Sequence, residues 1–146
     1  MNVDSSGLEV LTPDQCLALA TTVPIGRIVF TEQAMPAVQP VNFIIDGGCF
    51  IIRTAPGTKL AAATSNAIVA FEVDEFDAGS QTGWSVTIVG RAYPVRDSVE
   101  SARLAQLPLR AWAPGQRDRF IRIRPDRISG RRLGGRSRSN GSSNTD

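Results

Sequence analysis

The segment RTAPGTK, residues 53–59, combines residue types that bind phosphate. It contains Arg53 and Lys59, the only lysine of the chain, together with the hydroxyls of Thr54 and Thr58. A strand is predicted before it, Pro-Gly favours a turn, and the alanine-rich residues after it favour a helix. Backbone N–H groups are free at such a helix start, and both cation types pair with phosphate oxygens. The segment therefore predicts a phosphate-binding turn. Spacing alone leaves an exposed turn with solvated cations as the alternative.

The rest of the chain predicts short strands with two or three short helices. Thr12, Pro13 and Gln15 match a capped helix start with proline at its first position. The strands do not alternate with helices as in a β-α-β series. Their order therefore predicts a mainly β fold, an antiparallel barrel whose openings the helices cover. The expected strands are residues 25–30, 37–46, 49–54, 67–76, 84–95, 119–124 and a last one around 127–133, and the expected helices are residues 13–20, 58–66 and 98–107.

Two residues predict irregularities within these strands. Pro40 has no N–H to donate to a neighbouring strand, so we expect a sheet edge or a bulge there. Gly90 lies inside the longest predicted strand and favours a bulge. Residues 1–133 are expected to form one domain. Residues 134–146 are of low complexity and predict a disordered tail.

The composition excludes several kinds of site. The 146 residues include no histidine, which excludes metal and haem sites built on histidine and nucleophiles paired with it. Cys16 and Cys49 lack the spacing of metal ligands and predict two reduced, partly buried thiols, so no metal site is expected. No apolar run is long enough to span a bilayer and no secretory signal is visible, which favours the cytoplasm.

Charge is distributed unevenly along the chain. Residues 1–90 carry three basic and nine acidic residues, whereas residues 91–146 carry thirteen arginines and five acidic residues. A basic end is compatible with a nucleic-acid-binding barrel, but the chain has few aromatic residues to stack on bases, so we do not expect that partner. Alternate residues of a strand share a face. We accordingly interpret Arg122 and Arg124 as a solvated or dimer-contacting stripe, and Glu72 and Asp74 as salt-bridge partners for arginines.

Five motifs occur in one order across residues 25–92 and resemble a known family. They are IGRIVF, MPAVQPVNF, FIIRTAPGTKL, VAFEVD and TGWSVTIVGRA. Together they are similar to the pyridoxamine 5′-phosphate oxidase-like family, in particular to its small, actinobacterial-type branch related to nitroimidazole resistance. That resemblance implies a six-stranded antiparallel split β-barrel of Greek-key type, a homodimer, and FMN bound at the dimer interface.

The resemblance also implies which residues contact the cofactor. Thr54, Thr58 and Lys59, with Arg53 adjacent, match the phosphate-binding strand end and turn. The segment 39–42 matches the strand that lies along the isoalloxazine ring. Trp84 and Ser85 match a strand whose polar side chain reaches the flavin in longer relatives. The predicted cofactor-binding residues are Gln39, Pro40, Val41, Asn42, Arg53, Thr54, Thr58, Lys59, Trp84 and Ser85. Trp112 is a further candidate for covering a flavin or packing the dimer.

Departures from the family limit the function. The larger oxidases hold pyridoxal phosphate with an arginine and a histidine, and nitroimidazole-resistance relatives have a histidine at the active centre. This chain has no histidine. No catalytic residue is assigned. The sequence predicts a homodimeric FMN-binding oxidoreductase acting on an unidentified small molecule. The alternatives are a deazaflavin-dependent reductase of the same fold and a non-catalytic flavin- or haem-binding protein.

Overall fold

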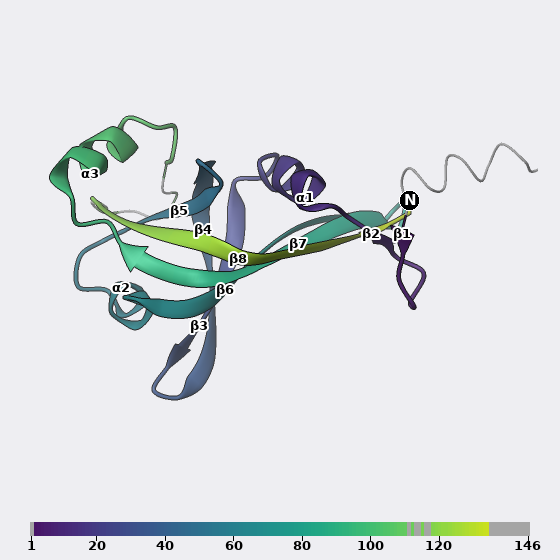
Figure 1. The fold of residues 1–146 in the computed structure, drawn as a ribbon, viewed down its shortest axis with the longest axis horizontal. Coiled ribbons are helices and arrows are strands. Elements are labelled where there is room, and N and C mark those ends of the chain that lie inside the picture. The colour runs from purple at the N-terminus through teal and green to yellow at the C-terminus, as the bar shows by residue number, and fades with distance from the viewer. Residues whose placement is uncertain (1, 111, 113–114, 116–117, 135–146) are drawn as a thin grey trace, which may run out of the picture.

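The computed structural model describes residues 2–110, 112, 115 and 118–134, and it is mainly β (Figure 1). The strands form one antiparallel sheet in the order β1-β2-β8-β5-β4-β3-β6-β7, and an additional β7–β8 pairing closes six of them, β3 to β8, into a ring. The strands are β1 Asn2–Val3, β2 Glu9–Val10, β3 Ile25–Glu32, β4 Met35–Asp46, β5 Cys49–Thr54, β6 Ala67–Asp77, β7 Thr82–Pro94 and β8 Arg119–Leu133, and the helices are α1 Pro13–Ala20, α2 Lys59–Thr64 and α3 Ser98–Ala105. The predicted fold class is confirmed.

The interior of the ring holds the main hydrophobic core. Along β6 and β7, buried residues alternate with half-exposed ones, as expected for strands with one face toward a core. Phe43, Phe50 and Phe71 meet at its centre, with ring centroids 5.1–5.7 Å apart. Gly26 packs so closely against the Phe71 ring that a Cβ there would overlap it. The chain therefore closes the barrel around aromatic side chains from three strands.

Local sequence signals act as predicted at several places. Thr12 caps α1, and its hydroxyl and the Gln15 side chain form a reciprocal capping box. The β7–β8 register shifts between Val89 and Gly90, which confirms the predicted bulge. A Cβ at Gly90 would overlap the backbone carbonyl of Arg124, so glycine is needed where the two strands approach.

Two predicted boundaries are wrong, and two short strands were not predicted. The strands expected at 119–124 and 127–133 are one continuous strand, β8, because the β7–β8 pairing continues on both sides of the register shift, with Pro125 opposite Gly90 and Arg127 opposite Val89. The gap between the strands expected at 25–30 and 37–46 is only a two-residue turn. Gln33 and Ala34 adopt left-handed backbone angles, with φ of 51° and 63°, and so join β3 directly to β4. The short strands β1 and β2 were not predicted, and the predicted tail lies outside the described residues apart from Gly134.

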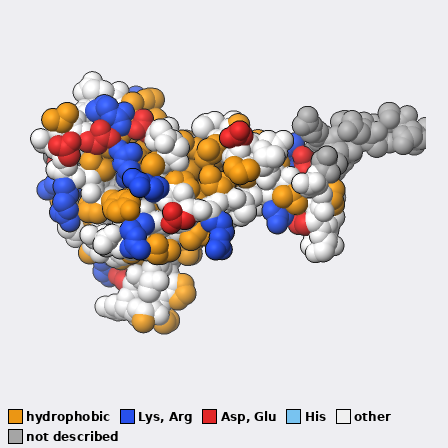
Figure 2. All heavy atoms as spheres, viewed as in Figure 1, with side chains coloured by type: hydrophobic (Ala, Val, Ile, Leu, Met, Phe, Trp, Pro, Cys, Tyr) orange, Lys and Arg blue, Asp and Glu red, His pale blue; other side chains and the backbone are white. Residues whose placement is uncertain are grey.

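The barrel is split along β4. Residues 35–42 pair with β3 on one side, but β5 pairs with β4 only over residues 43–46, so the first two thirds of β4 form an open edge. Pro40 lies in this edge, as its missing N–H predicts. The β3–β4 hairpin extends away from the body of the barrel (Figures 1 and 2). Met35 and Val38 of β4 are exposed. No helix within the described part of the chain is long and apolar enough to cross a membrane.

Candidate functional site

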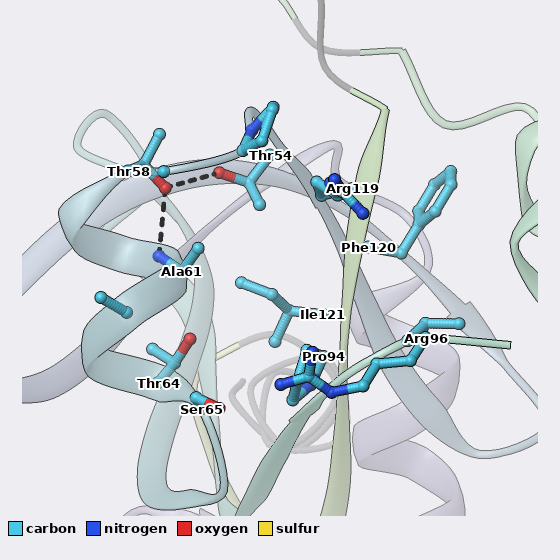
Figure 3. A pocket seen from close by; sticks show the side chains of 14 residues that line it. Thr54, Thr58, Ala61, Thr64, Ser65, Pro94, Arg96, Arg119, Phe120 and Ile121 are labelled. Atoms are coloured by element: carbon cyan, nitrogen blue, oxygen red, sulfur yellow. Dashed lines mark hydrogen bonds between the residues drawn. The ribbon is translucent and has the colours of Figure 1, made fainter.

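A pocket of about 430 Å³ lies between α2 and the adjoining ends of β5, β7 and β8 (Figure 3). We call it the α2 pocket. Its apolar lining includes Pro56, Pro94 and Ile121. Small-molecule sites commonly have such a mostly apolar lining with a few well-placed polar groups. The polar side chains that matter for its chemistry are Thr54, Thr58, Ser65, Arg96 and Arg119.

One wall of the α2 pocket carries hydroxyl groups. Thr54 ends β5 with its side chain buried, and its Oγ1 lies 3.3 Å from the Oγ1 of Thr58. Thr58 is the N-cap of α2, and its Oγ1 accepts the Ala61 N–H at 3.1 Å. The strand end and the helix cap thus hold two hydroxyls at fixed positions. Both can donate hydrogen bonds to an anionic oxygen.

The side of the pocket away from α2 carries two arginines that sequence reasoning missed. Arg96 follows the end of β7, and Arg119 opens β8 directly across from Thr54 in the β5–β8 ladder. Figure 3 shows both on the side of the pocket away from α2. Both side chains are exposed, and within the described residues neither forms an ion pair with a carboxylate. Only the β5–β8 pairing, between segments 65 residues apart, brings Arg119 to Thr54.

The two predicted phosphate-binding cations do not line this pocket. Arg53 lies on the face of β5 opposite Thr54, donates to the Leu109 carbonyl at 3.3 Å, and stacks over the Phe120 ring. Lys59 is 87% exposed, and its Nζ lies 3.9 Å from a carboxylate oxygen of Glu32. The structure brings Thr54 and Thr58 together, as the sequence suggested, and directs Arg53 and Lys59 elsewhere.

The predicted ring-binding segment runs along the open edge of β4. The last β4–β5 pair is Phe43 with Ile52. If the same register continued, Val41 would lie opposite Thr54. The segment therefore lies at the end of the barrel that holds the α2 pocket. Gln39 and Val41 face the interior side of the strand, and Pro40 and Asn42 the exterior side. Asn42 is engaged already, since its Nδ2 donates to the Pro24 carbonyl at 3.4 Å and its Oδ1 accepts the Trp112 N–H at 2.8 Å.

Trp84 and Ser85 lie at the other end of the barrel. Pro94 at the α2 pocket is ten residues further along β7, a span of about 33 Å at the usual strand rise of about 3.3 Å per residue. Trp84 is buried, whereas Ser85 faces outward and pairs with Asp74 and Arg131. One chain therefore does not bring these two residues to the predicted phosphate-binding turn.

A carboxyl pair lies on the outside of the barrel. The Arg27 guanidinium contacts Glu72 at 3.2 Å and Asp74 at 3.4 Å, which confirms the predicted salt bridges. Burial of the Glu72 side chain, followed by the neighbouring Asp74 carboxyl, raises the pKa of Glu72 to about 7, and Arg27 opposes that increase. Glu72 can therefore exchange a proton near neutral pH.

Comparisons with known proteins agree with this architecture, a split antiparallel barrel. A family model described as pyridoxamine 5′-phosphate oxidase matches residues 12–132. The uncharacterised protein Rv0080 of Mycobacterium tuberculosis is 35% identical over 134 residues, which cover 88% of each chain. An FAD-binding protein from Mycobacterium smegmatis is 35% identical with a TM-score of 0.72, and the match covers 85% of this chain and 96% of that one.

A further solved structure shares the fold at lower identity. It is an FAD-binding protein from Mesorhizobium loti, 23% identical with a TM-score of 0.72, and the match covers 87% of this chain and 99% of that one. The chain belongs to the pyridoxamine 5′-phosphate oxidase-like family. The resemblance carried by the sequence motifs is thereby confirmed.

Proposed function

We propose that this protein binds a flavin nucleotide such as FMN, with the cofactor phosphate in the α2 pocket, and acts as an oxidoreductase on a small molecule. The observation that carries the proposal is the wall of Thr54 and Thr58 hydroxyls facing two arginines without acidic partners among the described residues. These donors suit a phosphate, because charged and neutral groups can share its oxygens. The flavin-binding relatives favour the same ligand class.

The protein's own residues would bind and orient the cofactor. The hydroxyls of Thr54 and Thr58 and the guanidinium of Arg119 would hold the phosphate, and the open β4 edge would lie along the ring. The flavin, when bound, supplies the two-electron chemistry. The chain would provide positioning and exclusion of water, since no carboxylate, cysteine or lysine side chain lines the pocket.

A comparison of FMN with riboflavin tests the phosphate assignment. Thr54→Val keeps the shape of a buried side chain and removes its hydroxyl. We expect about tenfold weaker FMN binding by flavin-fluorescence titration and unchanged riboflavin binding, since a hydrogen bond to a charged group is worth roughly 1.5–3 kcal/mol. Thr31→Val, at an exposed threonine of β3, is the matched control. Equal loss for both ligands would place the phosphate elsewhere.

The same titration distinguishes the pocket from the predicted role of Lys59. The lysine points toward Glu32 and does not line the pocket. Lys59→Met should therefore weaken FMN binding less than Thr54→Val does. A larger loss for Lys59→Met would show that the phosphate sits at the start of α2 rather than inside the pocket.

We also propose that the site is completed by a second copy of the chain. The predicted contact residues Trp84 and Ser85 are too far from the α2 pocket to meet one flavin within a single barrel. The outer face carries an apolar row across four paired strands, formed by Val38, Val29, Ala70 and Val89. Val38 is 62% exposed, and the edge of β4 beside it lacks a partner strand. A homodimer would cover both features.

A charge placed in the apolar row tests this dimer. Val38→Glu should shift the protein toward monomer in sedimentation velocity and weaken flavin binding in parallel. Val99→Glu is the matched control, because Val99 is 75% exposed on α3, away from the row. A dimer that survives Val38→Glu, or a wild-type monomer that binds flavin tightly, would refute the proposed interface.

A further inference from the structure

We propose that Arg27, Glu72 and Asp74 link the pairing of two chains to protonation, so that the outer faces associate more tightly below neutral pH than above it. This inference rests on the homodimer proposed above and adds a means of regulating it. The three side chains meet on the outside of the barrel, away from the α2 pocket. We call them the carboxylate cluster.

The carboxylate cluster directly borders the apolar row. Arg27 pairs with Glu72 in the β3–β6 ladder, and the next pair on the same face is Val29 with Ala70, which belong to the row. Successive residues on one face of a strand are only about 7 Å apart, so the cluster and the row adjoin. A second copy of the chain that covers the apolar row therefore covers the cluster as well.

The cluster has an excess of negative charge. The Arg27 guanidinium lies 3.2 Å from a carboxylate oxygen of Glu72 and 3.4 Å from one of Asp74, so a single cation faces two carboxylates. With both carboxylates ionised, one negative charge is left over. One proton makes the cluster neutral, and a protonated Glu72 can donate a hydrogen bond to the Asp74 carboxylate.

Within the described residues, Arg27 is the only cation in contact with these two carboxylates. The β7 residues opposite them are Thr87 and Ser85, which are neutral. On the next strand, Arg131 lies opposite Ser85, but its Nε donates to Asp4 at 2.8 Å.

The other charged residues of β6 and of the elements packed against it do not neutralise the cluster either. Glu32 of β3 and Lys59 of α2 contact each other, and Arg91 of β7 donates to a backbone carbonyl. Glu75 and Asp77 lie on the opposite face of β6. The excess negative charge is therefore still present on the face that a second copy would cover.

Covering the cluster makes the association of two chains depend on pH. The pKa of Glu72 in the single chain is already about 7, and its side chain is still 26% exposed. A second copy would exclude water from this side chain and raise its pKa further. Below about pH 7 the carboxyl is protonated in both the single and the paired chain, so association has its full strength there. Above that pH association weakens, because pairing then requires the uptake of a proton.

Sedimentation velocity of the full-length protein, in dilution series at pH 6.5, 7.5 and 8.5, tests the inference. We expect the dissociation constant of the wild-type dimer to rise at least about tenfold from the lowest to the highest pH. Glu72→Gln and Asp74→Asn each remove the excess charge, so both variants should pair tightly across this range. Asp14→Asn is the matched control, because Asp14 is exposed on α1, whose buried side joins the core inside the ring.

The outcomes separate this inference from the proposed homodimer. A wild-type dimer that is equally stable at all three pH values overturns the inference while the homodimer stands. A pH dependence that persists unchanged in Glu72→Gln does the same, because another group would then be responsible. A wild-type protein that is monomeric at every pH overturns both. Thermal melting of each variant identifies any change that comes from misfolding.

Discussion

Replacing Glu72 by glutamine should remove a pH dependence from the stability of this protein. The folded-state pKa of Glu72 is raised from an ordinary 4.5 to about 7. The folded protein therefore binds more protons than the unfolded chain between these values, so the free energy of unfolding falls as the pH rises from about 4.5 to 7. Below pH 4.5 the carboxyl is protonated in both the folded and the unfolded state, so its raised pKa causes no loss of stability there.

The size of this effect follows from the position of the side chain. The full pKa change corresponds to at most about 3 kcal/mol. The side chain of Glu72 is 26% exposed, so solvent screening reduces the effect. We expect a loss on the order of 1 kcal/mol between pH 5 and 8 in the wild type.

Urea unfolding followed by tryptophan fluorescence at intervals between pH 5 and 8.5 provides the assay. Glu72→Gln should flatten the profile and be more stable than wild type at pH 8. Asp74→Asn should flatten it in part, because it removes the neighbouring negative charge that also raises the Glu72 pKa. Asp126→Asn, at an exposed carboxylate of β8, controls for the change in net charge. A Glu72→Gln profile as steep as that of wild type and Asp126→Asn would refute the reasoning.

Two further predictions concern the frame that holds the site. Gly90→Ala should lower the free energy of unfolding by about 2–3 kcal/mol or more in chemical denaturation, because its Cβ would overlap the carbonyl of Arg124. An unchanged unfolding midpoint would show that β7 and β8 separate easily there. Thr12→Ala should cost about 1 kcal/mol by removing the cap of α1, while Thr12→Ser should retain most of that stability.

Local chemistry made much of the fold predictable. The capping residues before α1 act over a few residues, and the structure places them as the sequence suggested. The bulge at Gly90 was predictable for the same reason. The boundaries of β8 were not, because the strand continues through an irregularity of its own, where Asp126 has no partner in the β7–β8 register.

The candidate site was predictable only in part. Thr54 and Thr58 meet because a strand end, a tight turn and a helix cap are local features. The alternation of side chains along a strand already separates Arg53 from Thr54, so their adjacency in sequence was misleading. Arg119 reaches the pocket through a long-range strand pairing, and the raised pKa of Glu72 depends on burial between strands. Both are properties of the assembled barrel.

The bound small molecule is the most direct test of the central claim, that the α2 pocket holds a flavin nucleotide. Full-length protein is reconstituted with a mixture of FAD, FMN and riboflavin, freed of unbound ligand, and analysed by native mass spectrometry beside the Thr54→Val and Arg119→Gln variants. The account predicts a two-chain species carrying a phosphorylated flavin, and lower occupancy in both variants. Retention of no flavin, or of riboflavin as readily as the nucleotides, would contradict it.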